Sequence, residues 1–173
     1  MQPLSGTSVL THVAHYRLNT QLFVARDVPT TFAFFADAGN LQRLTPPFLD
    51  FRILTPQPIA MHPGVLIDYQ IRIHGVPIRW RTEITQWTPP HRFVDQQRRG
   101  PYWQWDHTHT FAPVDGGTLV DDTVLYRPIG GALMHALFVR RDIERIFTFR
   151  QQEILAVFGV EAREPVAMRI DRV

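Results

Sequence analysis

The chain of 173 residues is 45% hydrophobic, which provides enough apolar material for one domain with a real core, and we do not expect two. It has no cysteine, which excludes disulfides, thiolate metal sites and cysteine nucleophiles, and all 18 basic residues are arginine, which excludes a Schiff-base lysine. The net charge is only +2, and the arginines alternate with acidic residues along the predicted strands, so we expect a solvated outer face rather than a nucleic-acid surface.

The first part of the chain predicts a strand followed by two short helices. The strand covers 16–26. Pro29 suits the first turn of a helix, because its missing N–H would have no partner there in any case, and this helix continues to about Gly39. A second short helix is predicted over 40–44, and a brief strand over 48–54 follows it.

Five consecutive stretches then alternate apolar and polar side chains, which is the pattern of strands with one buried face. They cover 65–73, 78–84, 92–99, 103–111 and 118–126. Their connections are short, whereas a parallel pair needs a crossover of about a dozen or more residues. The sequence therefore predicts an antiparallel meander.

The last predicted element is a long amphipathic helix that begins near Gly131 and ends at the glycine stop Gly159. Its apolar stripe consists of Val139, Ile143, Ile146, Phe147, Ile154 and Val157. Arg150 lies inside this stripe, and burying a guanidinium without a partner costs several kcal/mol or more. We expect Arg150 either to reach a rim or to meet a carboxylate, with Asp95 and Asp122 as the candidate partners.

Aromatic residues are concentrated on the inferred inner faces of the strands. They are Tyr69, Trp80, Phe93, Trp103, Trp105 and Phe111. Such a set either lines a pocket for a flat or polycyclic ligand or forms ordinary core packing. Single-stranded nucleic acid also stacks on open aromatic strand faces, but the long helix should cover this face, so we expect no nucleic-acid partner.

His107 and His109 lie two residues apart on one predicted strand and therefore on one face. The pair can hold a metal if Asp95 or Asp122 on a neighbouring strand supplies a third ligand. It can also move a proton as a general acid or base, or hydrogen-bond inside a polar pocket. Because nothing in the sequence fixes the third ligand, we favour hydrogen bonding, expect no metal or cofactor, and rank binding ahead of catalysis.

Several short motifs carry a resemblance to a known superfamily. They are Gly39-Asn40-Leu41, Leu44-Thr45-Pro46-Pro47, Ile67-Asp68-Tyr69, Gly75-Val76-Pro77, Trp80-Arg81-Thr82 and Gly100-Pro101-Tyr102, followed by Trp105, His107, His109 and Phe111. Together with the order of elements over residues 16–158, they resemble the SRPBCC superfamily, which includes the START, Bet v I-like and polyketide cyclase/dehydrase proteins. The resemblance is closest to a bacterial branch that carries this tryptophan–histidine strand.

The resemblance implies an α+β helix-grip fold: a seven-stranded curved antiparallel sheet around the long C-terminal helix, with two short helices after the first strand. We expect one ligand-binding domain over 15–160, a flexible segment over 1–14 and a tail over 161–173. Superfamily members bind lipids, sterols, polyketides, hormones or quinones in the cavity, and a minority catalyse cyclisation or dehydration there. No universal catalytic motif exists in the superfamily, and one fold hosts many functions.

The predicted function is binding, transport or sequestration of a hydrophobic small molecule with a polar or anionic end. The predicted site residues are Tyr69, Trp80, Phe93, Asp95, Gln97, Trp103, Trp105, His107, His109, Asp122, Tyr126, Ile146, Phe147 and Arg150. The first alternative is a cyclase/dehydrase-type enzyme that uses a histidine–aspartate pair, with His107, His109, Asp95 and Asp122 as candidates. The second is a metal-dependent activity at His107 and His109.

The sequence also predicts where the protein works. The start of the chain lacks the basic segment and apolar run of a signal peptide, and no window approaches the roughly 20 apolar residues of a membrane span. We therefore expect a cytoplasmic protein with no integral membrane association. The sequence does not determine the oligomeric state.

Overall fold

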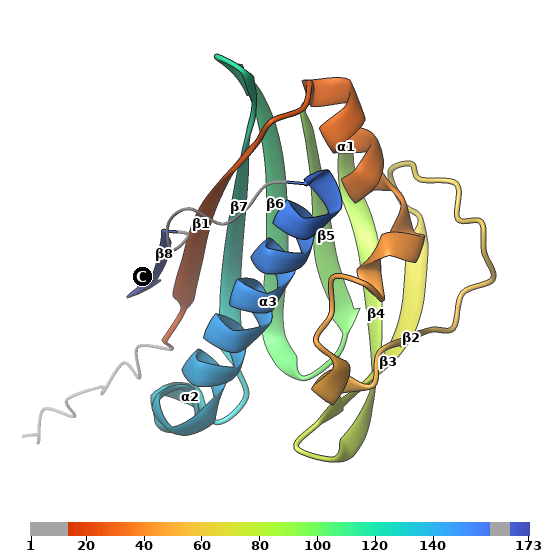
Figure 1. Ribbon diagram of the computed structural model, residues 1–173. Helices are drawn as coiled ribbons and strands as arrows, with labels where there is room; N and C mark the ends of the chain where they lie inside the picture. Colours follow the sequence, from red (N-terminus) through yellow and green to blue (C-terminus); the bar gives the residue numbers. More distant parts are fainter. Residues whose placement is uncertain (1–13, 160–166) are drawn as a thin grey trace, which may run out of the picture.

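The computed structural model describes residues 14–159 and 167–173 (Figure 1). Within these residues the chain forms one antiparallel sheet of eight strands, in the order β2-β3-β4-β5-β6-β7-β1-β8. The sheet curves around the long helix α3, and helix α1 lies near one end of the sheet (Figure 1). This arrangement confirms the predicted α+β helix-grip fold.

The elements follow the predicted order of strand, short helices, six strands and long helix, with one further strand at the end. The strands are β1 (Tyr16–Val24), β2 (Arg52–Ile53), β3 (Leu66–Ile73), β4 (Val76–Thr88), β5 (Arg92–Arg99), β6 (Tyr102–Val114), β7 (Gly117–Pro128) and β8 (Met168–Arg172). The helices are α1 (Val28–Ala36), the 3-10 turns η1 (Ala38–Leu41) and η2 (Pro47–Leu49), α2 (Gly131–Met134), the π-helical turn η3 (His135–Val139) and α3 (Arg140–Phe158).

The alternation of apolar and polar residues produces the meander as predicted. In β7 every second side chain is buried, namely Thr118, Val120, Asp122, Val124 and Tyr126. The β3–β4 connection is a tight turn in which His74 and Gly75 both have positive φ, at 48° and 84°. Two-residue hairpins favour this backbone, because it matches the twist of the flanking strands.

The predicted strand over 48–54 is wrong for most of its length. Pro47 begins η2, and Asp50 takes a left-handed φ of 40°, so only Arg52–Ile53 remain as strand. Proline has no N–H to donate to a neighbouring strand, which favours the turn over the ladder. The same segment brings Leu49 and Phe51 into the interior.

The long helix ends where the sequence predicts. Gly159 caps it in the left-handed conformation, with φ of 70° and its N–H directed to the carbonyl oxygen of Ala156. The buried side of α3 includes Ile143, Phe147 and Ile154 from the predicted stripe. The π-helical turn η3 near the start was not predicted, because one extra residue in a turn leaves the overall helical periodicity almost unchanged. No helix in the described part of the chain is long and apolar enough to cross a membrane.

The sheet has one strand more than the seven that the resemblance implied. Residues 168–172, which fall in the predicted tail, form β8 and pair antiparallel with β1. An exposed edge strand offers unpaired backbone groups, and β8 satisfies those of β1. The predicted flexible segment 1–14 lies outside the described residues except for Ala14. Residue 160 of the predicted domain and residues 161–166 of the predicted tail also lie outside the described residues.

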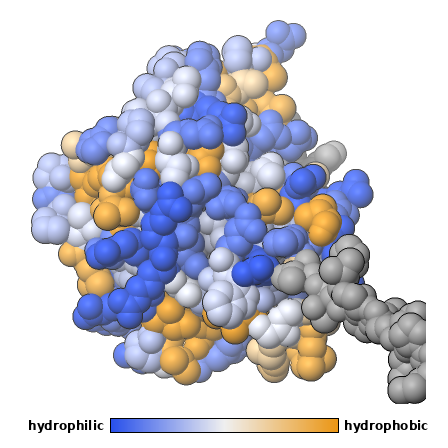
Figure 2. Space-filling view, turned by 180° about the vertical axis from the view of Figure 1, so that it is seen from behind, coloured by the Kyte–Doolittle hydropathy of each residue, from blue (hydrophilic) through white to orange (hydrophobic). Residues whose placement is uncertain are grey.

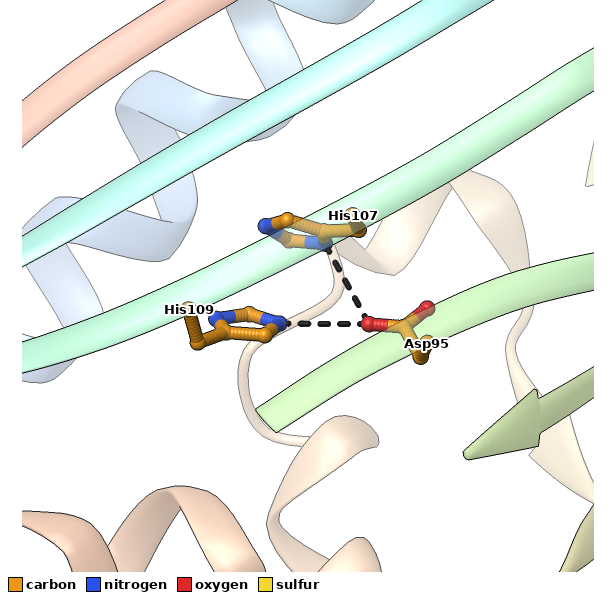
Figure 3. A group of neighbouring side chains, drawn as sticks. All are labelled: Asp95, His107 and His109. Atoms are coloured by element: carbon orange, nitrogen blue, oxygen red, sulfur yellow. Dashed lines mark hydrogen bonds and ion pairs between the residues drawn. The ribbon is translucent and has the colours of Figure 1, made fainter. Parts of the chain in front are cut away.

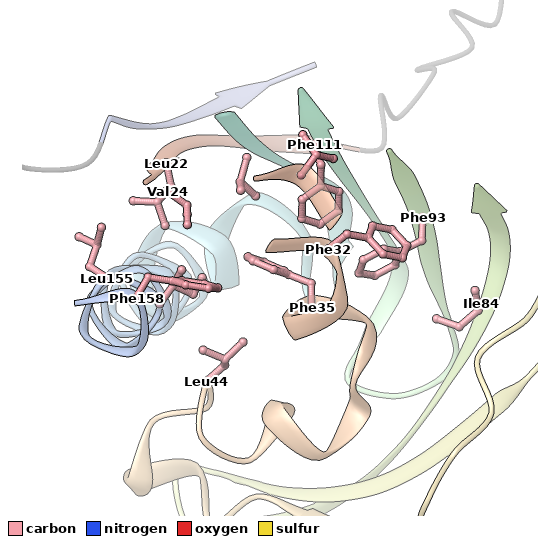
Figure 4. Packing of buried hydrophobic residues seen from close by; sticks show 13 residues of the cluster. Leu22, Val24, Phe32, Phe35, Leu44, Ile84, Phe93, Phe111, Leu155 and Phe158 are labelled. Carbon is pink, nitrogen blue, oxygen red and sulfur yellow. The ribbon is translucent and has the colours of Figure 1, made fainter. Parts of the chain in front are cut away.

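The largest core cluster fills the end of the structure beside α1 (Figure 4). Phe32 of α1 packs edge-on against Phe93 and Phe111, with ring centroids 6.0 and 5.3 Å apart, and Phe35 lies 5.1 Å from Phe111. Asp27 fixes the start of α1 by accepting a hydrogen bond from the N–H of Thr30 at 2.8 Å. This end of the interior is therefore closely packed with rings.

The face of the sheet turned away from α3 is largely hydrophilic, with separate hydrophobic patches (Figure 2). Arginines and carboxylates pair across neighbouring strands there: Arg81 with Asp68 at 2.8 Å, and Arg98 with Glu83 at 2.7 Å. These contacts fit the predicted solvated outer face, because the alternating arginines have acidic neighbours on the same surface.

Candidate functional site

A cavity of about 820 Å³ lies between the concave face of the sheet, α3, and the segment that carries η1 and η2. Its volume falls in the range of about 300–1,000 Å³ that is typical of small-molecule sites. Most of its lining is apolar, and the residues that line it from the strands and from α3 include Ile67, Tyr69, Ile71, Trp80, Ile84, Phe93, Asp95, Tyr102, Trp105, His107, His109, Ile146, Phe147 and Arg150. The cavity borders on all three buried clusters of the molecule.

Ten of the fourteen predicted site residues line this cavity. They are Tyr69, Trp80, Phe93, Asp95, Trp105, His107, His109, Ile146, Phe147 and Arg150. The other four, Gln97, Trp103, Asp122 and Tyr126, are not among the lining residues. Trp103 is exposed to solvent, and the other three side chains contact residues around the cavity.

The predicted inward orientation of Trp103 is wrong, since its side chain is 64% exposed. The pairing of β6 with β7 shifts register between Tyr102 and Gln104, which marks a bulge at this point. A bulge inserts one residue and so reverses which side chains point inward before it. Tyr102 therefore takes the predicted place of Trp103 and packs against Trp105 with ring centroids 4.7 Å apart.

Gln97 and Tyr126 make hydrogen bonds that connect elements around the cavity. The Gln97 side chain donates to the carbonyl oxygen of Tyr102 at 2.7 Å and accepts from the Tyr102 N–H at 3.4 Å, which ties together the two ends of the β5–β6 turn. The Tyr126 hydroxyl lies 2.9 Å from Nε2 of His135, which joins β7 to the start of the long helix.

The polar part of the cavity wall is assembled by the register of three neighbouring strands. Asp95 of β5 pairs directly with His107 of β6, and His109 of β6 pairs directly with Asp122 of β7. Paired residues point to the same face of a sheet, so all four side chains meet on the concave side.

Both imidazoles approach one carboxylate oxygen of Asp95 (Figure 3). Nε2 of His109 lies 3.2 Å from Oδ2 of Asp95, and Nδ1 of His107 lies 3.7 Å from the same oxygen. The opposite ring nitrogens face Asp122: Nδ1 of His109 is 2.5 Å from Oδ1, and Nε2 of His107 is 3.4 Å from it. The histidine pair is thus enclosed between the buried carboxylate of Asp122 and the half-buried carboxylate of Asp95.

Arg150 has the partner that its place in the apolar stripe requires. Its Nε lies 3.7 Å from Oδ2 of Asp122, and its guanidinium lies 5.6 Å from the ring centroid of Phe35. Of the two predicted partners, Asp122 is therefore the one in contact. Asp122 joins α3 to the histidine pair, because its other oxygen faces the imidazoles.

The charges of the cluster shift the protonation of its members. Burial opposes ionisation of Asp122 and Asp95, but the adjacent histidines lower the pKa of both, most strongly for Asp122. Burial also opposes protonation of His109, yet Asp122 and Asp95 raise its pKa above the ordinary value. Burial and the neighbouring His109 lower the pKa of His107. The directions of these shifts favour the charged form of His109 and the neutral form of His107.

Several lining residues escaped the sequence reasoning. Leu49 is the last residue of η2 and Phe51 follows shortly after it, and the ring of Phe51 lies 5.0 Å from that of Tyr69. His74 of the β3–β4 turn and Asp142 of α3 also line the cavity, and their side chains meet at 2.8 Å. The proline-rich run before Leu49 was the available signal, since it marks a segment that must cross the structure without strand pairing.

Comparisons with known proteins agree with this fold. A family model described as "Polyketide cyclase / dehydrase and lipid transport" matches residues 24–152. Protein CV1439 from Chromobacterium violaceum has a similar structure, with a TM-score of 0.66 and 12% identity over 84% of this chain and 98% of that one. Protein Ms6760 from Mycobacterium smegmatis gives 0.61 and 19% over 83% and 90%, and Ara h 8.0201 gives 0.61 and 12% over 84% and 98%. No curated protein matches the chain in sequence.

Proposed function

Because this chain belongs to the polyketide cyclase/dehydrase and lipid transport family, we propose that its cavity binds a hydrophobic small molecule with a polar end, for transport or sequestration. The observation that carries the proposal is the cavity of about 820 Å³ with a mainly apolar lining and a polar cluster of Asp95, His107, His109 and Arg150 in its wall. Apolar pockets with a few convergent polar groups are the usual form of small-molecule sites.

The aromatic wall supports a ligand that contains rings. Trp80 stacks on Tyr69 with centroids 5.7 Å apart and meets Trp105 edge-on at 5.5 Å. Tyr102 adds a further ring 5.7 Å from Trp80. These side chains offer flat and edge surfaces to a ring system, and their rigidity limits the entropy lost on binding.

The polar cluster supports a neutral polar end, such as a hydroxyl or a carbonyl group. Arg150 already contacts Asp122, so an anionic end would have to compete with that carboxylate. The two carboxylates of the cluster are matched by Arg150 and by His109, whose pKa is raised. Replacing Arg150 by alanine should therefore weaken neutral and carboxylate-bearing ligands to a similar extent.

The proposal is tested by filling the cavity. Ile146→Trp adds a large ring at a lining position, and we expect it to weaken binding of the fluorescent probe 1-anilinonaphthalene-8-sulfonate by about tenfold or more, which is about 1.4 kcal/mol. The matched control is Leu133→Trp on α2, where the native side chain is 68% exposed and does not line the cavity. Equal affinity in Ile146→Trp and the parent protein would contradict the proposal.

Native mass spectrometry of protein purified from its own host identifies the ligand class. A mass that is present under gentle conditions and lost on denaturation is the expected result, and its fragmentation gives the chemical class. The same measurement on Ile146→Trp should show less of the bound compound.

A cyclase or dehydrase that uses the same cavity is the second candidate, and one observation favours it. The rings of His107 and His109 lie side by side in the cavity wall with centroids 3.8 Å apart, and the opposite directions of their pKa shifts favour His109 as proton donor and His107 as proton acceptor. Turnover of the compound recovered from the native protein should then fall about 100-fold or more in His107→Gln, with binding retained. Equal turnover in the two proteins would remove this candidate.

A further inference from the structure

We propose that Asp95, His107 and His109 form a binding site for a divalent transition-metal ion in the cavity wall. The ligand atoms are Oδ2 of Asp95, Nδ1 of His107 and Nε2 of His109, and all three lie within 4.8 Å of one another. The site goes beyond the proposed function, since an ion can bind there whether or not the cavity holds a hydrophobic molecule.

The spacing of these atoms fits one shared ion. Metal–ligand bonds to histidine nitrogen and carboxylate oxygen are about 2.0–2.2 Å, so two ligands of one ion stand about 3.0–3.5 Å apart. The distances from Oδ2 of Asp95 are 3.2 Å to His109 and 3.7 Å to His107. The first distance falls in this range and the second lies close to it, and the three residues offer ligand atoms that all lie within 4.8 Å of one another.

Asp122 provides the outer contacts that metal-binding histidines usually have. Each histidine turns one ring nitrogen toward Asp95 and the other toward Oδ1 of Asp122. A histidine that ligates a metal commonly donates its second N–H to a carboxylate, which fixes the ring and its tautomer. Here one carboxylate serves both rings.

Proton counting favours an ion over a purely hydrogen-bonded cluster. Two imidazoles carry two N–H donors when both are neutral and three when one is protonated, but their four nitrogens face carboxylate oxygens in four contacts. At least one ring nitrogen therefore faces a carboxylate oxygen with no proton between them. Nδ1 of His109, Nε2 of His107 and Oδ1 of Asp122 are buried and make no well-aligned hydrogen bond among the described residues. A metal between Asp95 and the rings occupies two contacts and leaves both N–H groups for Asp122.

The donor set indicates the kind of ion. Two imidazoles and one carboxylate suit zinc, iron(II), cobalt(II) or manganese(II) better than calcium or magnesium, which prefer oxygen ligands alone. All three residues line the cavity, so the remaining coordination positions face the space in which a ligand would lie. Three protein ligands with an open position are the arrangement of catalytic rather than structural metal sites.

The test uses metal ions alone, added to chelator-treated protein. We expect one equivalent of Co²⁺ to bind with visible absorption bands, and Zn²⁺ to displace it in calorimetry. His109→Ala and Asp95→Ala should each weaken Co²⁺ binding by about 100-fold or more, and Asp122→Asn by about 10-fold to 100-fold through the outer contact. The matched control is His91→Ala, which removes an exposed histidine that does not line the cavity and should leave affinity unchanged.

Two outcomes would overturn the proposal. One is a parent protein that binds neither Co²⁺ nor Zn²⁺ at millimolar concentration. The other is folded His109→Ala protein that binds Co²⁺ as tightly as the parent. If the alanine variants do not fold, X-ray absorption spectroscopy of the Zn²⁺-loaded parent protein tests the site directly. Two imidazole ligands on the zinc ion support the proposal, and a zinc ion without two imidazole ligands contradicts it.

Discussion

Asp122 is the residue on which most of the buried charge depends. Its two oxygens face Arg150 on one side and the rings of His107 and His109 on the other, and its side chain is almost fully buried. Removing one member of a buried charge cluster leaves the others without compensation, which costs far more than the loss of an exposed pair. The same residue therefore contributes to stability and to the shape of the site.

We therefore expect the same substitution to destabilise the protein far more at Asp122 than at the exposed Asp68. Asp122→Asn should lower the free energy of unfolding by about 3–5 kcal/mol. Asp68→Asn, which breaks an exposed pair with Arg81, should lower it by less than about 1 kcal/mol. Urea unfolding of both variants measures the difference, and equal losses would show that the buried charges are not coupled as the contacts indicate.

His135 gives stability a dependence on pH. It is buried at the start of the long helix, where its ring stacks on Tyr16 with centroids 3.5 Å apart and contacts the Tyr126 hydroxyl. Burial and the nearby Arg140 lower its pKa, and Glu144 acts in the opposite direction. The unfolded chain therefore binds a proton at His135 at a higher pH than the folded protein does.

The sign of the effect follows from this difference in proton binding. Stability from His135 is complete above its unfolded pKa of about 6.5 and is lost as the pH falls toward the folded pKa. The stability advantage of the parent over His135→Gln should therefore shrink between about pH 7.5 and pH 5.5. An NMR titration of Arg140→Gln should show a higher pKa for His135, and an unchanged pKa would remove Arg140 as a cause.

At the scale of elements, the β3–β4 turn and α3 meet at a solvent-exposed part of the cavity lining. His74 in the turn contacts Asp142 of α3 at 2.8 Å, and the ring of Phe138 lies 5.9 Å from that of His74. The side chains of His74, Phe138 and Asp142 all line the cavity. The contact joins the sheet to the helix on opposite sides of the cavity, so it can slow the passage of a ligand.

We expect His74→Ala to speed the release of a bound probe several-fold, with little change in unfolding free energy, because the pair is exposed. Stopped-flow dissociation of 1-anilinonaphthalene-8-sulfonate measures the rate. Glu144→Gln is the matched control, since it breaks the exposed Arg140–Glu144 pair on the same helix without touching the cavity lining. An unchanged release rate in His74→Ala would mean that the ligand leaves by another route.

At the scale of the whole molecule, the two ends of the interior differ. The end beside α1 is filled by phenylalanine rings, whereas the region between β3, β4 and α3 keeps a cavity of about 820 Å³ (Figure 4). A void of this size deprives its lining of contacts and so lowers stability. Ligand binding should therefore raise the melting temperature, because a ligand that binds only the folded state shifts the equilibrium toward it.

Local sequence patterns predict most of the elements and the faces of most strands. Alternation with a period of two marks the strands of the meander, and the apolar stripe with its terminal Gly159 marks the helix. These signals are local, because each depends on the geometry of a few consecutive residues. They were enough to place ten of the predicted site residues on the cavity.

Which side chains meet depends on the three-dimensional arrangement of the strands and helices. The bulge after Tyr102 turned Trp103 outward. Residues 168–172 pair with β1 and add a strand that their short sequence of mixed polarity does not predict. Strand register brought Asp95 opposite His107 and Asp122 opposite His109. It therefore determined which carboxylates lie beside the two histidines, which the sequence alone left open. Register and cavity volume depend on contacts between residues far apart in the chain, and no local pattern encodes them.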